Sequence, residues 1–248
     1  MSHAQRFGSA ALSIAIVLVL SACTPNPTSS TPDASARPVT TEEAQLLAVT
    51  RFNNYDAGTR PFSTTLTQQG AQLTVTGWID YVAHVGYAAV TGAFHPQAMV
   101  WSDSTVGIIP QTPDHNGNPI LPMPAADADW HSRPLDPTTS RLDAMLAVLS
   151  SLGSDRPDNP LLVQQTGALW LRDDTVDSTP VSVFAAPPTD KPSDASSAPI
   201  TAETSSLRLW VDDTGLMRRA EVRLGDDWTT ADMPDGAGPA LALPEGAQ

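Results

Sequence analysis

Residues 73–80 read Leu-Thr-Val-Thr-Gly-Trp-Ile-Asp, and this stretch decides the fold class. Its aliphatic residues alternate with threonines and with Trp78, which is the period of two expected of a β-strand. The turn signal Gln69-Gly70 precedes it, and a Thr- and Phe-rich run over 61–68 precedes that turn. Two such runs joined by a short turn pair antiparallel.

Further strands are predicted on both sides of a central helical region. The connections between neighbouring strands are short, so an antiparallel sheet is expected. The last pair forms a hairpin around Asp212-Asp213-Thr214-Gly215, a favourable turn sequence. The predicted strands cover 85–91, 98–101, 167–172, 180–185, 207–211 and 216–224.

Two helices are predicted beside these strands. The first begins after Thr40, where Glu43 three residues later completes a capping-box signature, and ends between residues 53 and 58. The second begins near 136–138 and ends at Gly153. Its apolar residues share one face, which must pack on the sheet, so the fold class is α+β. They are Leu142, Met145, Leu146, Leu149 and Leu152.

The first 22 residues predict a lipoprotein signal peptide. An apolar run over 10–20 follows Arg6, and eleven residues rise only ~16 Å as a helix, too short to span a bilayer. The run ends in Leu20-Ser21-Ala22-Cys23, which matches the lipobox of bacterial lipoproteins. The Cys23 thiol is the group that would take the diacylglyceryl lipid, because a thiolate is a strong nucleophile. An ordinary export signal with a stray cysteine is the alternative.

The rest of the chain divides by composition. Residues 23–40 predict a lipidated cysteine followed by a disordered Pro/Ser/Thr tether, because nothing there can bury apolar surface. Residues 41–231 have the size of one domain. Pro-rich stretches at 110–137 and 186–202 predict long loops, with Trp130 as an anchor in the first. Residues 232–248 predict a flexible tail.

Charge and cysteine content exclude several classes of protein. The formal net charge is −14, which opposes binding to nucleic acid and to anionic lipid headgroups. It also predicts a body that stands away from the bilayer, held by acyl chains. Cys23 is the only cysteine in the chain, so an internal disulfide is impossible.

The sequence carries no recognisable catalytic or metal-binding motif. It has no Gly-x-Ser-x-Gly or Ser-x-x-Lys pattern, and its histidines lack close ligand spacing. Residues 114–118, Asp-His-Asn-Gly-Asn, begin like a calcium loop, but Pro119 and Ala125 stand where glycine and glutamate are needed. An Asn-Gly turn is the better interpretation. We therefore expect no enzymatic activity, metal or cofactor.

Tryptophans suggest a second apolar face on the sheet. Trp78 and Trp210 alternate with the aliphatic residues of their strands, so the two sets point to opposite faces. Either a ligand or partner covers the aromatic face, or the protein's own helices and loops do. The candidate cavity or sheet-face aromatics are Trp78, Trp101, Trp170 and Trp210.

These features together resemble the LppX/LprG-type cell-envelope lipoproteins of Gram-positive bacteria. The similarity lies in the lipobox, the tether, residues 77–81 (Gly-Trp-Ile-Asp-Tyr) and the hairpin 209–219 (Leu-Trp-Val-Asp-Asp-Thr-Gly-Leu-Met-Arg-Arg). The resemblance implies a LolA-like half-barrel, a curved antiparallel sheet with helices on its concave face. It also implies an apolar cavity for the acyl chains of envelope lipids.

Two functions remain open at this point. The first is a lipoprotein anchored on the extracytoplasmic side of the cell membrane that binds or carries a lipid. The second is a non-catalytic structural or interaction lipoprotein that engages another envelope protein through its loops. Both predict attachment to the membrane through the acyl chains.

Overall fold

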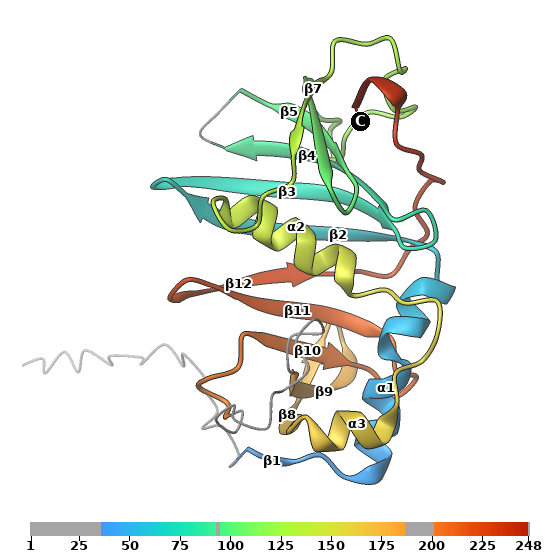
Figure 1. The fold of residues 1–248 in the computed structure, drawn as a ribbon, viewed down its shortest axis with the longest axis vertical. Coiled ribbons are helices and arrows are strands. Elements are labelled where there is room, and N and C mark those ends of the chain that lie inside the picture. The colour runs from blue at the N-terminus through green and yellow to red at the C-terminus, as the bar shows by residue number, and fades with distance from the viewer. Residues whose placement is uncertain (1–35, 93–94, 187–200, 248) are drawn as a thin grey trace, which may run out of the picture. The chain divides into compact units, whose positions relative to one another are not determined.

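The computed structural model describes residues 36–92, 95–186 and 201–247, and within them twelve strands form one open, curved antiparallel sheet (Figure 1). All of them belong to one compact unit, Asp33–Gln248. The strand order is β1-β8-β9-β10-β11-β12-β2-β3-β4-β5-β6-β7, and the edge strands β1 and β7 do not meet. The predicted α+β class with an open antiparallel sheet is confirmed. The strands are β1 (Arg37–Pro38), β2 (Thr59–Gln68), β3 (Ala71–Asp80), β4 (Val85–Gly92), β5 (Gln97–Trp101), β6 (Thr105–Pro110), β7 (His131–Pro134), β8 (Leu169–Val176), β9 (Thr179–Ala186), β10 (Leu207–Val211), β11 (Met217–Leu224) and β12 (Asp227–Asp232).

The sheet has two halves that meet at one short seam between β12 and β2. Along β2 and β3 ten residue pairs are in register. Across the seam two pairs are in register, Ala231 with Thr64 and Asp232 with Ser63. The Thr64 hydroxyl adds a hydrogen bond of 2.7 Å to the Thr230 carbonyl oxygen. The seam is therefore the least extensively paired junction between long strands.

Three α-helices and a short 3₁₀ helix complete the described chain: α1 (Thr41–Asp56), α2 (Arg141–Ser151), α3 (Pro160–Gln165) and η1 (Glu245–Ala247). The predicted capping box of α1 is present, since Thr40 accepts from the Glu43 amide and Glu43 accepts from the Thr40 amide. Helix α2 lies across one face of the sheet beside β2 and β11, as Figure 1 shows. It therefore lies over the seam.

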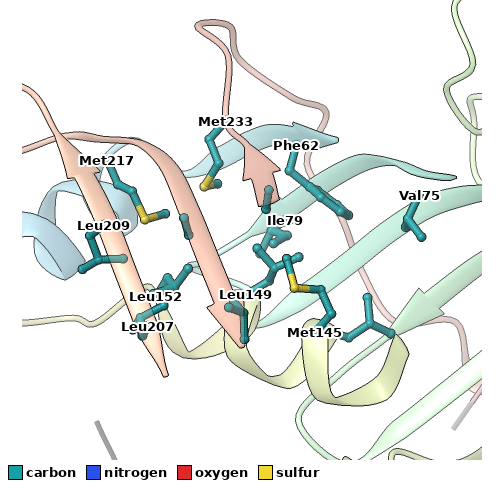
Figure 2. Packing of buried hydrophobic residues seen from close by; sticks show 14 of the residues in the cluster. Phe62, Val75, Ile79, Met145, Leu149, Leu152, Leu207, Leu209, Met217 and Met233 are labelled. Atoms are coloured by element: carbon teal, nitrogen blue, oxygen red, sulfur yellow. The ribbon is translucent and has the colours of Figure 1, made fainter. Parts of the chain in front are cut away.

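The largest hydrophobic core lies between α2 and the sheet (Figure 2). The leucine stripe predicted for α2 points into it, and Met145, Leu146 and Leu149 are fully buried. Met99, Met217 and Met233 contribute from the strands and from the segment after β12. Methionine is unbranched and polarisable, so a core rich in it can repack around a changed shape.

The opposite face of the sheet is also apolar, as the alternation of Trp78 and Trp210 with aliphatic residues predicted. One cluster on this face contains Tyr87 and Trp130, with Trp78 packed against it, and the C-terminal residues Leu241 and Ala247 cover it. A second cluster surrounds Trp210 on β8, β9 and β10. The chain's own segments therefore supply the cover of the first cluster.

The structure differs from the sequence predictions in the segments that carry little periodicity. Residues 233–247, expected to be a flexible tail, pack on the sheet because Met233, Leu241 and Ala247 fill apolar space there. Arg37 and Pro38, expected in the tether, form β1. Strand β7 lies inside the loop expected at 110–137, and α2 begins after Ser140 because Asp136 binds the Thr138 amide in a separate turn. Helix α3, β6 and β12 were not predicted.

Candidate functional site

The two sides of α2 differ in residue size. The side toward the sheet carries the large buried residues of the core. Beside it run smaller, half-buried residues: Ala144, Ala147, Val148 and Ser151. Small side chains leave space on this side of the helix, which residues of β10 and β11 also line.

A partly open groove of about 310 Å³ occupies that space. Its volume is at the lower end of the range for small-molecule sites. Most of its lining is apolar, which suits a hydrocarbon chain better than a polar metabolite. The lining residues are Pro137, Ala144, Ala147, Val148, Ser151, Ser206, Leu207, Val222, Arg223 and Leu224.

The N-terminus of α2 is fixed by a buried carboxylate. The Asp143 side chain is fully buried and receives a hydrogen bond of 2.7 Å from the Arg133 guanidinium, together with one of 2.9 Å from the Asp136 amide. Ser140 caps the helix by accepting from the Asp143 amide. The Leu142 amide donates to Gln68 of β2. This end of the helix is therefore tied to β2 and β7.

The C-terminus of α2 is fixed by a buried polar chain from α1. The Asn54 amide group donates to the Leu152 carbonyl oxygen at 2.7 Å, and Arg51 donates to the Ser151 carbonyl oxygen at 2.9 Å. Arg60 in turn donates to the Asn54 side-chain oxygen at 2.7 Å. Burial lowers the pKa of the Arg60 guanidinium. Both ends of α2 are held, so the groove beside it has a defined wall.

Trp101 is the predicted aromatic residue that donates a hydrogen bond to α2. It is fully buried in the core, meets Phe62 edge-on at 5.9 Å between ring centroids, and donates to the Ser150 hydroxyl of α2 at 3.1 Å. Gly86 makes room for it, because a Cβ there would lie 2.0 Å from the indole ring. Trp101 therefore supports α2 from beneath.

The other three predicted tryptophans lie elsewhere. Trp78 packs on the opposite face of the sheet beside the C-terminal segment. Trp210 lies on that face too and donates to Asp174 at 3.0 Å. Trp170 carries the Arg37 guanidinium 4.4 Å above its ring. None of the four predicted tryptophans is among the residues that line the groove.

The groove could not be predicted from the sequence, because its lining residues come from Pro137, α2, β10 with Ser206 before it, and β11. The signal that could have found it is the row of small residues at 144, 147, 148 and 151 on α2. A row of that kind beside a leucine stripe leaves a channel wherever a strand does not fill it. Which strand faces the row depends on the fold and cannot be read from spacing.

The histidines and acidic residues of the described chain do not gather into a metal site. Over 36–247, apart from the two gaps, no three His, Cys, Asp or Glu side chains lie as ligands of one ion would. The Asp114 carboxylate accepts from the amides of Asn116 and Asn118 at 2.8 and 2.9 Å, within its own turn. These contacts are those of an Asx turn.

The predicted anchor lies outside the described residues. This holds for the signal peptide and for the lipobox, Leu20, Ser21, Ala22 and Cys23. In the part of the chain that is described, no helix combines the length and the hydropathy needed to cross a bilayer.

Comparison with known proteins finds a similarity to a solved structure. No protein-family model matches the sequence, and no curated protein matches it. The crystal structure of LprF from Mycobacterium bovis matches 86% of this chain and 100% of that chain, with 12% identity and a TM-score of 0.42. No function is taken from this similarity.

Proposed function

We propose that this chain is a lipoprotein anchored on the outer side of the cell membrane, where it binds the acyl chain of an envelope lipid beside α2. The observation that carries the proposal is the apolar groove of about 310 Å³ between α2 and β10–β11. It adjoins a core with four methionines, Met99, Met145, Met217 and Met233, which can repack as a chain enters. The polar residues of the lining that the structure describes are Ser151, Ser206 and Arg223, and the proposed role is binding rather than chemistry.

The expected affinity follows from the amount of hydrocarbon that the groove can shield from water. Each buried methylene contributes ~0.8 kcal/mol, so six to eight methylenes contribute ~5–6 kcal/mol before ordering costs. That is enough for detectable binding. Longer chains gain more if the methionines move aside.

A titration tests this function directly. The delipidated chain from Thr24 onward, without the anchor, is mixed with a fluorescent fatty acid whose absorption overlaps tryptophan emission. Saturable energy transfer is expected, because Trp101 contacts α2 through Ser150. A signal that rises without a plateau would indicate micelle association, and its appearance with several lipid classes would refute the proposal.

A groove-filling substitution locates the binding. Ala147→Phe places a ring in the groove, so uptake should fall at least about tenfold. The matched control is Ala83→Phe on the exposed β3–β4 turn, which should bind as the native chain does. Equal uptake by the two variants would place the ligand elsewhere. Mass spectrometry of lipid extracted from the native protein would then name the class bound.

The anchor needs its own test. Cys23→Ala should abolish acylation and either release the protein into the medium or leave an unprocessed precursor. If the variant remains membrane-bound and normally processed, the lipobox interpretation is wrong. Failure of the lipid titration with an intact anchor would instead favour the second function, an interaction lipoprotein that works through its loops.

A further inference from the structure

Helix α3 presents two adjacent leucines to solvent. Leu161 is 64% exposed and Leu162 is 56% exposed, the largest exposed fractions among the large hydrophobic residues of the described chain. The helix begins at Pro160, with Asn159 as its N-cap. Its other apolar residue, Val163, packs against the core. The helix is therefore fixed, and the two leucines do not share in that packing.

Helix α3 lies at the corner of the molecule where the described chain begins. Arg37 and Pro38 of β1 pair with Trp170 and Leu169 of β8, four residues after α3 ends. The Gln164 side chain donates to the Thr41 hydroxyl at the start of α1, at 3.4 Å. Figure 1 shows α3, β1 and the start of α1 at the same end of the body. Any tether to the N-terminus leaves from this corner.

The other residues of this corner suit the surface of a bilayer. Trp170 is half-buried, and the Arg37 guanidinium, which also pairs with Glu43, lies 4.4 Å above its ring. Tryptophan and arginine side chains each have an apolar part and a polar end, which suits the boundary between acyl chains and headgroups at the membrane interface. Exposed leucines beside them can enter the boundary between headgroups and acyl chains.

We propose that Leu161 and Leu162 form a membrane-contact surface through which the anchored protein rests on the lipid bilayer. The proposal depends on the anchor proposed above, because two leucines are too few to recruit a soluble protein. Twelve residues, 24–35, separate Cys23 from the described chain. Twelve residues can extend over at most ~40 Å, which limits how far the corner can lie from the lipid. This contact fixes the orientation of the body, which the net charge alone would hold away from the surface.

The test uses an artificial tether, so that it does not depend on natural acylation. The chain from Thr24 onward carries an N-terminal hexahistidine tag and is held on phosphatidylcholine vesicles that contain a nickel-chelating lipid. This chain keeps the whole compact unit Asp33–Gln248 and has no cysteine of its own. Gln165→Cys, at the exposed end of α3, takes an environment-sensitive fluorophore and leaves both leucines in place. Ala83→Cys carries the control label.

We expect a blue shift and quenching by nitroxide-labelled lipid at position 165 and not at position 83. Leu161→Ser with Leu162→Ser should abolish both signals. Val82→Ser, which removes a hydrophobic residue that is 54% exposed on another element, should leave them unchanged. Labels that stay in water at both positions would overturn the proposal. So would a blue shift that appears without vesicles and grows with protein concentration, because a second copy would then cover α3. Absence of acyl groups on native Cys23 would refute the anchor, but this measurement would still decide the contact.

Discussion

Helices α2 and α3 both carry leucines, but the leucines of α2 are buried and those of α3 are exposed. In α2 the leucines at 142, 146 and 149 are at most 5% exposed, while in α3 Leu161 and Leu162 are more than half exposed. The difference is one of position: α2 lies across the seam of the sheet, and α3 packs on α1 at the edge of the molecule. Apolar content alone therefore does not decide burial. A helix face that the described residues leave exposed is available to something outside the chain.

The largest effect is expected from a charge in the α2 core. Leu146→Asp would place a carboxylate in a fully buried apolar position and cost several kcal/mol of the free energy of unfolding. Leu162→Asp, the matched change on α3, should cost less than about 0.5 kcal/mol. Thermal melts of the two variants give the comparison. Equal melting temperatures would mean that the α2 stripe is not part of the core.

A smaller effect is expected from the buried carboxylate that holds α2. Asp143→Asn keeps the shape of the side chain but removes the negative charge that pairs with Arg133. It should lower the free energy of unfolding by about 2–4 kcal/mol, because the Asp143 side chain is fully buried. The control is Asp227→Asn, whose partner Arg141 forms an exposed pair worth under about 1 kcal/mol. Denaturant unfolding of both variants measures the difference. A loss as small as that of the control would contradict a structural role for Asp143.

The first turn of α1, at the α3 corner, should lose stability in acid. The hydrogen bond from Arg37 to Glu43 lowers the pKa of the Glu43 carboxyl from its usual 4.5. A lowered folded-state pKa contributes stability above pH 4.5 that is lost as the pH falls through the folded-state value. Protection of the first-turn amides of α1 against hydrogen exchange, relative to their intrinsic exchange rates, should therefore fall below pH 4.5. Glu43→Gln should remove this dependence. Protection that stays constant through this range in the native chain would contradict the prediction.

The smallest effect on stability is expected for the two exposed leucines of α3, which the proposed membrane contact requires. Leu161→Ser and Leu162→Ser should each change the free energy of unfolding by less than about 0.5 kcal/mol, because neither side chain is buried. Leu149→Ser, on α2, should cost several kcal/mol. Urea unfolding compares them. A large loss at Leu161 or Leu162 would mean that α3 is covered within the molecule.

The elements with strong periodicity could be predicted from the sequence. Two patterns repeat often enough to define an element and its buried face: the alternation over 73–80 and the leucine stripe of α2. The turn sequence at 212–215 defines the hairpin of β10 and β11. The two-faced character of the sheet also followed from the alternation of Trp78 and Trp210 with aliphatic residues. The local pattern was enough to predict these elements, because the spacing of apolar residues in each one places them on a single face, and that face is buried.

The rest depended on which segments meet in space. Helix α3 has six residues, less than two turns, and so cannot display a helical stripe. The segment after 232 reads as a loop by composition, but Leu241 and Ala247 fill a surface that other strands create. The groove exists because small residues of α2 face β10 and β11, which lie more than 50 residues later in the chain. The spacing of residues within one segment does not predict which distant segment packs against it.

The seam between β12 and β2 has a consequence for how the chain acquires its structure. The hydrogen bond from Thr64 to Thr230 closes a separation of 166 residues. Closing so long a loop is slow, and topologies dominated by distant pairings fold slowly. The two halves of the sheet cannot join, and α2 cannot bridge them, until the last strand has been made. We therefore expect a long-lived unfolded state of the newly made chain, which the export implied by the proposed function would require.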